Sequence, residues 1–441
     1  LTSNFEAYNL CLQGRHFRDH ETLESSHKAV ELFEKAVQID PDYALAYAGL
    51  AEAYIFLRNT SLISEGISWQ HSQRKADLLE KAEAAAQKAL KLDDALAEAH
   101  VSMGLVNHNR GDKKAFLQNL RRAIELNPHL PNARRELGLE LFRHHGKLRE
   151  GLTELREAHQ LDPLSTVILA NLGSALLANG LIEETVSKAR QIRELSPTTM
   201  DEIILLGEVH FVLSDWRRAE RYYRKFLALD RAHRAATVEA FARGPLRRIY
   251  WLESRTQEAR KEAERFLKPN PDLSRAILYA GLVADMEGDH LKALELFERA
   301  YRLSSTPVER IDYRAFWHSY EYSTWLGHTY WRLGRLKEAQ EKLEESLEFD
   351  RQRLAAGDES PQVRIGLAEI YAIRGEKGKA YRWLQQGIEA GFLEYTFLER
   401  HPFFANLHDD SRFKRMMAEI KAKVGVMRHR VREMEKEWDE L

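Results

Sequence analysis

Three groups of residues in this sequence have types and spacing that could support chemistry: a glycine-lysine run, a histidine pair and neighbouring carboxylates. Residues 375–379 read Gly-Glu-Lys-Gly-Lys, which resembles part of a phosphate-binding loop. In such a loop the backbone N–H groups cradle the phosphates and a lysine reaches their oxygens. The run lacks the full spacing of that motif, and no strand pattern precedes it. We therefore predict a turn between two helices at this point.

The histidine pair and the carboxylates are the remaining candidates for chemistry. No histidine or carboxylate lies four residues after His144 or His145 to complete a metal-ligand pair on one helix face, so we interpret the pair as part of a solvated turn. The carboxylates mostly neighbour lysine or arginine, as Glu341 neighbours Lys342. Catalytic acids need a cleft that separates their pKa values, and no such cleft is indicated. The sequence therefore predicts no enzyme and no catalytic, cofactor or metal residues.

A pattern of aromatic, small and large residues recurs about every 34 residues along most of the chain. Representative copies contain Tyr47, Leu50, Ala51 and Tyr54, or Leu206, Gly207, Ala219 and Tyr223. Small residues at fixed positions let the two helices of a hairpin approach closely, and large residues fill the space between them. These positions resemble those of the tetratricopeptide repeat (TPR) family. The resemblance implies an all-α superhelical solenoid of about ten helical hairpins.

The repeats also predict how the chain is organised. We expect repeats 1–6 in residues 1–230, a degenerate seventh repeat in 231–271, repeats 8–10 in 272–392, and an end segment with a long C-terminal capping helix in 393–441. The first helix of the seventh repeat lacks the usual leucine-glycine pair. Gly244 and Pro245 are expected to interrupt that helix, because proline has no N–H and clashes with the preceding turn. We therefore predict a joint at the seventh repeat.

The composition limits the partners that we expect. The 441 residues are 44% hydrophobic and 30% charged with a formal net charge of −2, whereas nucleic-acid-binding domains are usually strongly basic. Cys11 is the single cysteine, which excludes an intrachain disulfide and fits a reducing compartment. No apolar run approaches the length of a membrane span. We therefore predict a cytoplasmic protein that binds neither nucleic acid nor membrane.

The two ends of the chain show a narrower resemblance. At the start, residues 4–15 and 41–51 resemble the TPR halves of modular bacterial signalling proteins. Near the end, residues 391–392, 402–403 and 410–413 are similar to the end segment of the same group. In that group the repeats follow a winged-helix regulator, a serine/threonine kinase or a class III nucleotide cyclase. The resemblance implies a bacterial origin and an effector domain N-terminal to this chain.

The inner face of the predicted superhelix is the candidate binding surface. The family resemblance implies that this face is lined by the second, fifth, ninth, twelfth and thirteenth positions of the first helix of each repeat. Many of these positions are apolar here, and an apolar groove with a basic rim suits an extended peptide or an amphipathic helix. The predicted groove residues are Arg135, Leu139, Phe142, Arg143, Leu177, Ile204, Phe211, Leu278 and Leu282. Two alternatives remain open: the superhelix closes on itself, or a terminal segment fills the groove.

The C-terminal region predicts a long helix with an apolar seam. Seam residues recur at alternating spacings of four and three: Phe413, Met417, Ile420, Val424, Met427, Val431, Met434 and Trp438. A helix over 411–441 would be roughly 45 Å long, too long for simple capping to cover its distal half. We predict that Val424, Met427, Val431, Met434 and Trp438 mediate self-association as a homodimer. The alternative is docking into the solenoid's own groove.

These observations predict an interaction protein. We expect a non-catalytic scaffold and regulatory module that binds a protein or peptide on its concave face and transmits occupancy to an attached effector domain. A ligand that fixes the curvature of a compliant solenoid would shift the population of states at that domain. Two other functions remain open: a structural scaffold for self-assembly, and a sensor of peptides or small molecules.

Overall fold

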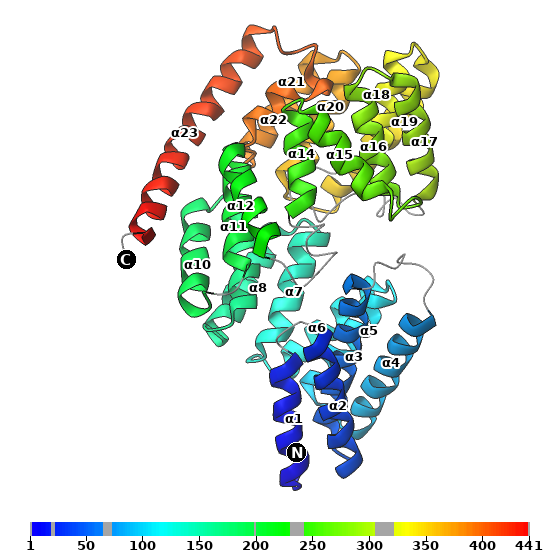
Figure 1. Ribbon diagram of the computed structural model, residues 1–441, viewed down its shortest axis with the longest axis vertical. Coiled ribbons are helices and arrows are strands. Elements are labelled where there is room, and N and C mark those ends of the chain that lie inside the picture. Colours follow the sequence, from blue (N-terminus) through cyan, green and yellow to red (C-terminus); the bar gives the residue numbers. More distant parts are fainter. Residues whose placement is uncertain are drawn as a thin grey trace. The chain divides into compact units, whose positions relative to one another are not determined.

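The computed structural model describes residues 2–18, 23–64, 73–197, 200–229, 242–304 and 322–439, and the regular elements within these ranges are all helices. Most helices pair with the next one along the chain, and the pairs follow one another as stacked hairpins (Figure 1). The prediction of an all-α solenoid of helical hairpins is therefore confirmed. No helix in the described ranges is long and apolar enough to cross a membrane.

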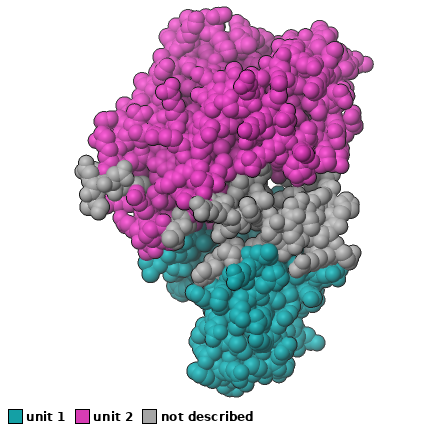
Figure 2. Space-filling view, in the orientation of Figure 1, with its two compact units in different colours: residues 1–140, 153–168, 232–237 teal, residues 141–152, 169–231, 238–441 magenta. Residues whose placement is uncertain are grey.

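The chain divides into two compact units (Figure 2). Unit 1 contains residues 1–140 and 153–168 of the described chain, and unit 2 contains residues 141–152, 169–231 and 238–441. The helices up to the division are α1 (Phe5–Arg18), α2 (Leu23–Ile39), α3 (Ala44–Ser64), α4 (Gln73–Leu92), α5 (Ala97–Asn109) and α6 (Lys113–Leu126). Three helices cross it: α7 (Pro131–His144), α8 (Leu148–Leu161) and α9 (Thr166–Ala178).

Unit 2 continues with further hairpins and a C-terminal region. Its hairpin helices are α10 (Ile182–Leu195), α11 (Asp201–Val212), α12 (Trp216–Leu229), α14 (Gly244–Leu252), α15 (Thr256–Leu267), α16 (Ser274–Met286), α17 (His290–Leu303), α18 (Tyr322–Arg332), α19 (Leu336–Ala355), α20 (Pro361–Ile373) and α21 (Lys377–Glu389). The C-terminal region contains α22 (Tyr395–Arg400), the short 3₁₀ helix η2 (Pro402–Phe404) and α23 (Ser411–Asp439).

The recurring small and large residues have the packing role that the pattern predicts. The Tyr223 ring of α12 is fully buried against Gly207 of α11, and a Cβ added to Gly207 would lie 2.8 Å from that ring. Only glycine therefore lets this pair of helices approach closely. At residues 375–379 the structure confirms the predicted turn, because Gly375 has a φ of +75° and lies between α20 and α21. A positive φ of this size strongly favours glycine.

Two local predictions can be compared with the structure. Residues 242–243 form a π-helical turn, and Gly244 and Pro245 then begin α14 with the proline in its first turn, where it has no intrahelical N–H bond to lose. The preceding residues 230–241 lie outside the described residues, so the predicted joint stays a prediction. His144 and His145 are half-buried rather than solvated. Within the described ranges, no group of three histidine, cysteine or acidic residues could hold a metal ion.

The turn after α7 also closes unit 2 upon itself. The Glu359 N–H, between α19 and α20, donates to the Gly146 carbonyl at 2.9 Å. In return, the Arg149 N–H donates to the Glu359 carboxylate at 3.0 Å, across a separation of 210 residues. The first and last repeats of unit 2 are therefore in contact, which is one of the two alternatives that the sequence left open.

Candidate functional site

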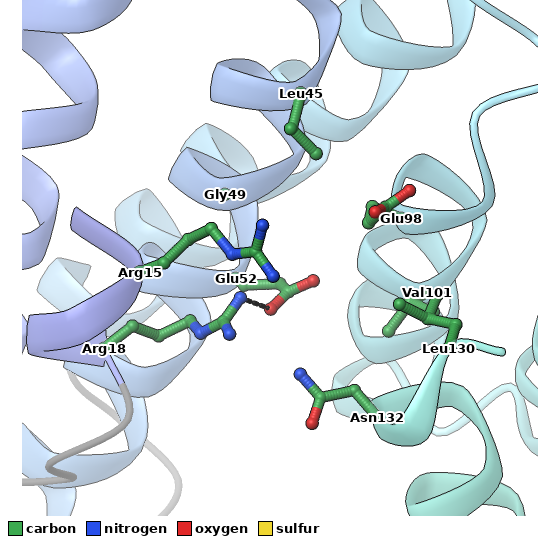
Figure 3. A pocket seen from close by; sticks show the side chains of 9 residues that line it. All are labelled: Arg15, Arg18, Leu45, Gly49, Glu52, Glu98, Val101, Leu130 and Asn132. Atoms are coloured by element: carbon green, nitrogen blue, oxygen red, sulfur yellow. Dashed lines mark hydrogen bonds and ion pairs between the residues drawn. The ribbon is translucent and has the colours of Figure 1, made fainter. Parts of the chain in front are cut away.

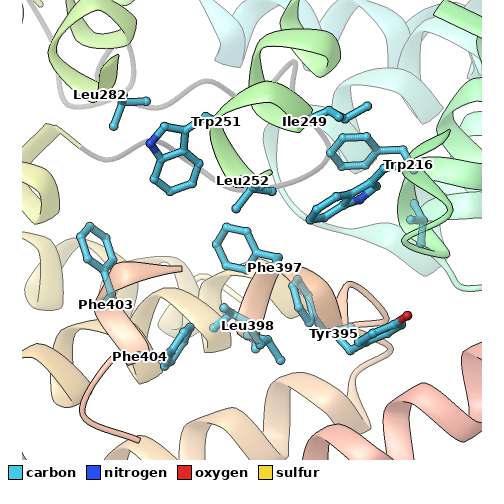
Figure 4. Close-up of a cluster of buried hydrophobic side chains, with 14 of the residues drawn as sticks. Trp216, Ile249, Trp251, Leu252, Leu282, Tyr395, Phe397, Leu398, Phe403 and Phe404 are labelled. Atoms are coloured by element: carbon cyan, nitrogen blue, oxygen red, sulfur yellow. The ribbon is translucent and has the colours of Figure 1, made fainter. Parts of the chain in front are cut away.

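The inner face of unit 2 is occupied by the chain itself, through residues 392–410, which we call the inserted segment. Most apolar side chains of this segment are at most 5% exposed: Phe392, Leu393, Tyr395, Phe397, Leu398, Phe403, Phe404 and Leu407. In Figure 4, Phe397 and Phe403 face Leu252 and Trp251 of α14. The Phe403 ring also lies 4.5 Å from the Trp325 ring of α18. Because α14 and α18 are first helices of their hairpins, the segment fills the inner face.

This filling changes the interpretation of the predicted groove. Five of the predicted groove residues are at most 4% exposed and form core: Phe142, Leu177, Phe211, Leu278 and Leu282. They belong to unit 2 and pack within its core, and their role in a partner-binding groove stays a prediction. The repeat register identifies which residues face inward. It does not reveal that a distant segment of the same chain covers them.

The four remaining predicted groove residues are half-buried. Arg135 and Leu139 belong to unit 1, whereas Arg143 and Ile204 belong to unit 2. The Arg135 guanidinium pairs with Glu136 at 2.5 Å. The Arg143 guanidinium donates to the Asn171 side chain at 3.4 Å. These arginines therefore have partners within the chain.

Beneath the inserted segment lies a buried polar cluster. Its members occupy the ninth position of the first helix in their repeats: Glu208, Arg248, His328 and Glu369. The Arg248 guanidinium pairs with Glu394 of the inserted segment at 3.0 Å, and both side chains are at most 4% exposed. Burial raises the pKa of Glu208 and Glu394 to about 7 and that of Glu369 to about 8. The Arg248 guanidinium therefore pairs with Glu394 in a cluster whose buried carboxyls ionise only near or above neutral pH.

Unit 1 has an open hollow on its inner face. The lining residues come from α1, α3, α5 and the start of α7: Arg15, Arg18, Leu45, Gly49, Glu52, Glu98, Val101, Leu130 and Asn132 (Figure 3). The hollow measures about 380 Å³, including space open to solvent.

A buried ion pair forms the floor of this hollow. The Arg18 guanidinium lies 2.6 Å from the Glu52 carboxylate, and the two side chains are 9% and 7% exposed. The Ser102 hydroxyl, fully buried in α5, donates to the Ala48 carbonyl of α3 at 3.0 Å. Because a buried charge is costly unless it is paired, these contacts fix the floor and leave Arg18 unavailable to a ligand.

Three polar side chains around the floor lack such partners. Arg15 is exposed, and Glu98 and Asn132 are half-buried. Within the described part of the chain, their side chains form no hydrogen bond or ion pair. A guanidinium, a carboxylate and an amide can together bind the charged, donor and acceptor groups of a peptide.

The sequence contained the signal for these residues. Counting the ninth and twelfth positions in the first repeat gives Arg15 and Arg18. The second and ninth positions in the second repeat give Leu45 and Glu52, and the second and fifth in the third repeat give Glu98 and Val101. The predicted groove residues all lie in the fourth and later repeats. The same register therefore identifies the hollow once it is applied to every repeat.

The C-terminal helix α23 packs on the repeats of unit 2. Val424 and Val431 are fully buried, Met427 and Met434 are half-buried, and the Trp438 side chain lies outside the described residues. The helix runs along α10 and contacts α22. The sequence predicts self-association of these residues, with docking into the solenoid's own groove as the alternative; the structure shows α23 packed against α10 and α22. The structure therefore gives the seam an intrachain partner, and a homodimer stays a prediction.

The carboxylate of Glu435 holds the distal part of α23. It lies 2.7 Å from the His210 Nε2 atom and 2.6 Å from the Arg218 guanidinium, and it accepts a hydrogen bond from the Tyr222 hydroxyl at 2.9 Å. Burial is the largest single effect and opposes ionisation of Glu435, but the contacts with His210, Tyr222 and Arg218 together outweigh it and lower the pKa of the carboxyl. The contact is therefore a charged one between α23 and the α11–α12 hairpin.

Comparison with known proteins confirms the repeat type. One tetratricopeptide repeat family model matches residues 20–43, 97–130 and 320–353, and a second tetratricopeptide repeat model matches residues 248–306. The chain thus contains tetratricopeptide repeats, as the recurring pattern predicted. Among curated protein sequences, none matches this chain.

Several solved structures are similar to this chain. They include a human IFIT1 dimer with PPP-AAAA, with 19% identity over 64% of this chain and 70% of that chain and a TM-score of 0.41. Another is YrrB, described as a TPR protein with an unusual peptide-binding site. It is 21% identical over 48% of this chain and 98% of YrrB, with a TM-score of 0.31. PilF of Pseudomonas aeruginosa is 17% identical over 59% of this chain and 94% of PilF, with a TM-score of 0.32.

Proposed function

We propose that this chain is a non-catalytic protein-interaction scaffold that binds a peptide segment of a partner protein in the hollow of unit 1. The observation that supports the proposal is the set of polar groups around this hollow. Arg15, Glu98 and Asn132 surround a fixed ion pair and form no hydrogen bond or ion pair within the described chain. The inner face of unit 2, in contrast, is filled by residues 392–410.

The chemistry of the lining suits a peptide. The Asn132 amide offers both a donor and an acceptor, which matches the alternating N–H and C=O groups of an extended backbone. Arg15 and Glu98 have opposite charges and favour one orientation of the bound segment. Leu45, Val101 and Leu130 line the hollow and offer apolar contact to its side chains.

The signalling part of the proposal rests on the resemblance of the chain's two ends to bacterial signalling proteins. We propose that the scaffold is a regulatory module attached to an effector domain. Occupancy of the hollow would shift the population of solenoid conformations and thereby the state of that domain. The alternatives are a self-assembly scaffold, which the intrachain docking of α23 makes less favourable, and a small-molecule sensor, which the peptide-like lining makes less favourable.

A displayed library of random peptides tests the peptide-binding function. Peptides selected on the native chain are expected to bind an Asn132→Trp variant at least tenfold more weakly, because the indole would fill the hollow. The control is Arg121→Trp, at an exposed position on α6 that does not line the hollow. Equal binding of the selected peptides to the native chain and the Asn132→Trp variant would refute the proposed site.

A further inference from the structure

The inner faces of the two units have an arginine at the same repeat position. Arg15 of α1 and Arg248 of α14 both occupy the ninth position of the first helix in their repeats. Arg248 is 4% exposed and pairs with a carboxylate of the inserted segment. Arg15 is exposed and lines the hollow. The inner face of unit 2 therefore shows which side chains can bind an arginine at this repeat position.

In unit 2 the inserted segment recognises Arg248 through one helical turn. Glu394 immediately precedes α22 and accepts a hydrogen bond from the Arg248 guanidinium at 3.0 Å. Phe397, three residues later, places its ring 5.0 Å from the same guanidinium. The N-cap residue and the first turn of α22 thus present both groups to the same guanidinium. A carboxylate and an aromatic ring are the two side-chain types that stabilise a guanidinium most strongly.

In unit 1 the corresponding carboxylate is not supplied by the neighbouring repeat. The ninth position of the second repeat is Glu52, and this carboxylate is already paired with Arg18 at 2.6 Å. Tyr8, on the same helix as Arg15, is 43% exposed. An acidic group from outside the described chain would therefore complement the charge of Arg15. On the opposite side of the hollow, repulsion from the Glu98 carboxylate disfavours a second acid.

We propose that the hollow of unit 1 selects partner segments in which an acidic residue is followed three positions later by an aromatic residue. The carboxylate pairs with Arg15 and the ring packs on the guanidinium, as Glu394 and Phe397 do at Arg248. The inference rests on the proposed function, because it specifies the peptide that the hollow binds. Arg15 is the specificity-determining residue of the site, and Asn132 and the apolar lining bind the segment irrespective of its sequence.

The test uses a labelled, acetylated and amidated peptide with the sequence of residues 391–400, Gly-Phe-Leu-Glu-Tyr-Thr-Phe-Leu-Glu-Arg. Binding to the full chain is measured by fluorescence anisotropy. Because the chain's own segment occupies unit 2, the peptide is expected to bind at unit 1. Changing Glu394→Gln or Phe397→Ala in the peptide is expected to weaken binding at least tenfold each.

Variants of the protein identify the site. Arg15→Gln is expected to weaken binding of the native peptide at least tenfold, and Arg15→Lys by less, because lysine keeps the charge and loses the planar guanidinium. Binding to Arg121→Gln, a second exposed arginine in unit 1, is expected to remain unchanged. Thermal melts by circular dichroism verify that all three variants fold, as expected for exposed positions.

The outcomes separate this inference from the proposed function. If library-selected peptides depend on Asn132 but the acid and aromatic positions have no effect, the inference is refuted and the hollow remains a peptide site. If the peptide binds equally to the native chain and to Arg15→Gln, it occupies another surface, and the inference is again refuted. If every library-selected peptide binds the Asn132→Trp variant as well as the native chain, the proposed function itself is refuted.

Discussion

The inner faces of the two units consist of the same kind of helix and differ in what covers them. In unit 2 the first helices surround residues 392–410, and their inward side chains, such as Phe211 and Leu282, are core. In unit 1 the corresponding positions surround a hollow with an exposed arginine. The comparison shows that the repeat pattern determines which residues face inward. A segment outside the repeats determines whether they stabilise the fold or remain available to a ligand.

The largest expected difference between the two inner faces is in the free energy of unfolding after an inward aromatic residue is replaced by glutamate. Phe211→Glu in unit 2 is expected to lower the free energy of unfolding by about 4 kcal/mol or more, because it removes a buried ring and buries a charge. Tyr8→Glu in unit 1 is expected to change it by less than about 0.5 kcal/mol, because Tyr8 is exposed. Urea denaturation measures both. Similar losses in the two variants would contradict the contrast between core and open surface.

The next largest expected difference in stability between the two faces follows removal of one carboxylate from each. Glu394→Ala leaves the buried Arg248 guanidinium without its ion-pair partner and is expected to cost about 3 kcal/mol. Glu98→Ala in the hollow is expected to change stability by less than about 0.5 kcal/mol, because this carboxylate has no partner within the described chain. Thermal unfolding of the two variants provides the comparison. A large loss in the Glu98 variant would mean that the hollow is a structural core.

The buried acids of unit 2 predict how its stability depends on pH. Burial raises the pKa of Glu208 and Glu394 to about 7 and that of Glu369 to about 8, above the value of about 4.3 for an unfolded glutamate. The folded state then binds more protons than the unfolded state between about pH 4.3 and 8. Stability is therefore fully present below this window and is lost as the pH rises through it.

We expect the free energy of unfolding of unit 2 to fall between pH 5 and pH 8.5, by roughly 3 kcal/mol for each acid that remains protonated to about pH 7 in the folded state. Fluorescence of the buried Trp251 and Trp325 reports on this unit during denaturation. A Glu369→Gln variant should show a smaller decrease, because glutamine stays neutral throughout. A rise in stability over this pH range would show that these acids are ionised in the folded chain.

The sequence predicted the fold well and the site only in part. The spacing of small and large residues, such as Gly207 opposite Tyr223, is local, so it identifies the hairpins directly. The pairing of Glu394 with Arg248 joins residues 146 positions apart, and no periodicity indicates such a contact. For this reason the repeat pattern, which predicts an open groove at Phe211 and Leu282, does not indicate that both side chains are buried. The repeat numbering also places Arg15 and Glu98 on the inner face, but all predicted groove residues lie in later repeats.

The smallest expected effect concerns how α23 is held on unit 2. Glu435 contacts His210, Arg218 and Tyr222 with a side chain that is 11% exposed, so Glu435→Gln should weaken docking by about 1–2 kcal/mol. Arg430→Gln removes a pair with Glu183 whose side chains are 61% and 51% exposed, and it should have little effect. Hydrogen exchange in the distal half of α23 measures the difference.

Light scattering then decides between intrachain docking and self-association of α23. A chain ending at Lys423 lacks the distal seam residues, including Val424 and Val431. If these residues pack within the chain, the truncated protein keeps the same number of copies per particle as the intact one. In that case the surface of α10 that α23 contacts becomes more accessible to exchange. A loss of half the mass on truncation would instead show that the seam joins two copies, and that the intrachain contact is not the one present in solution.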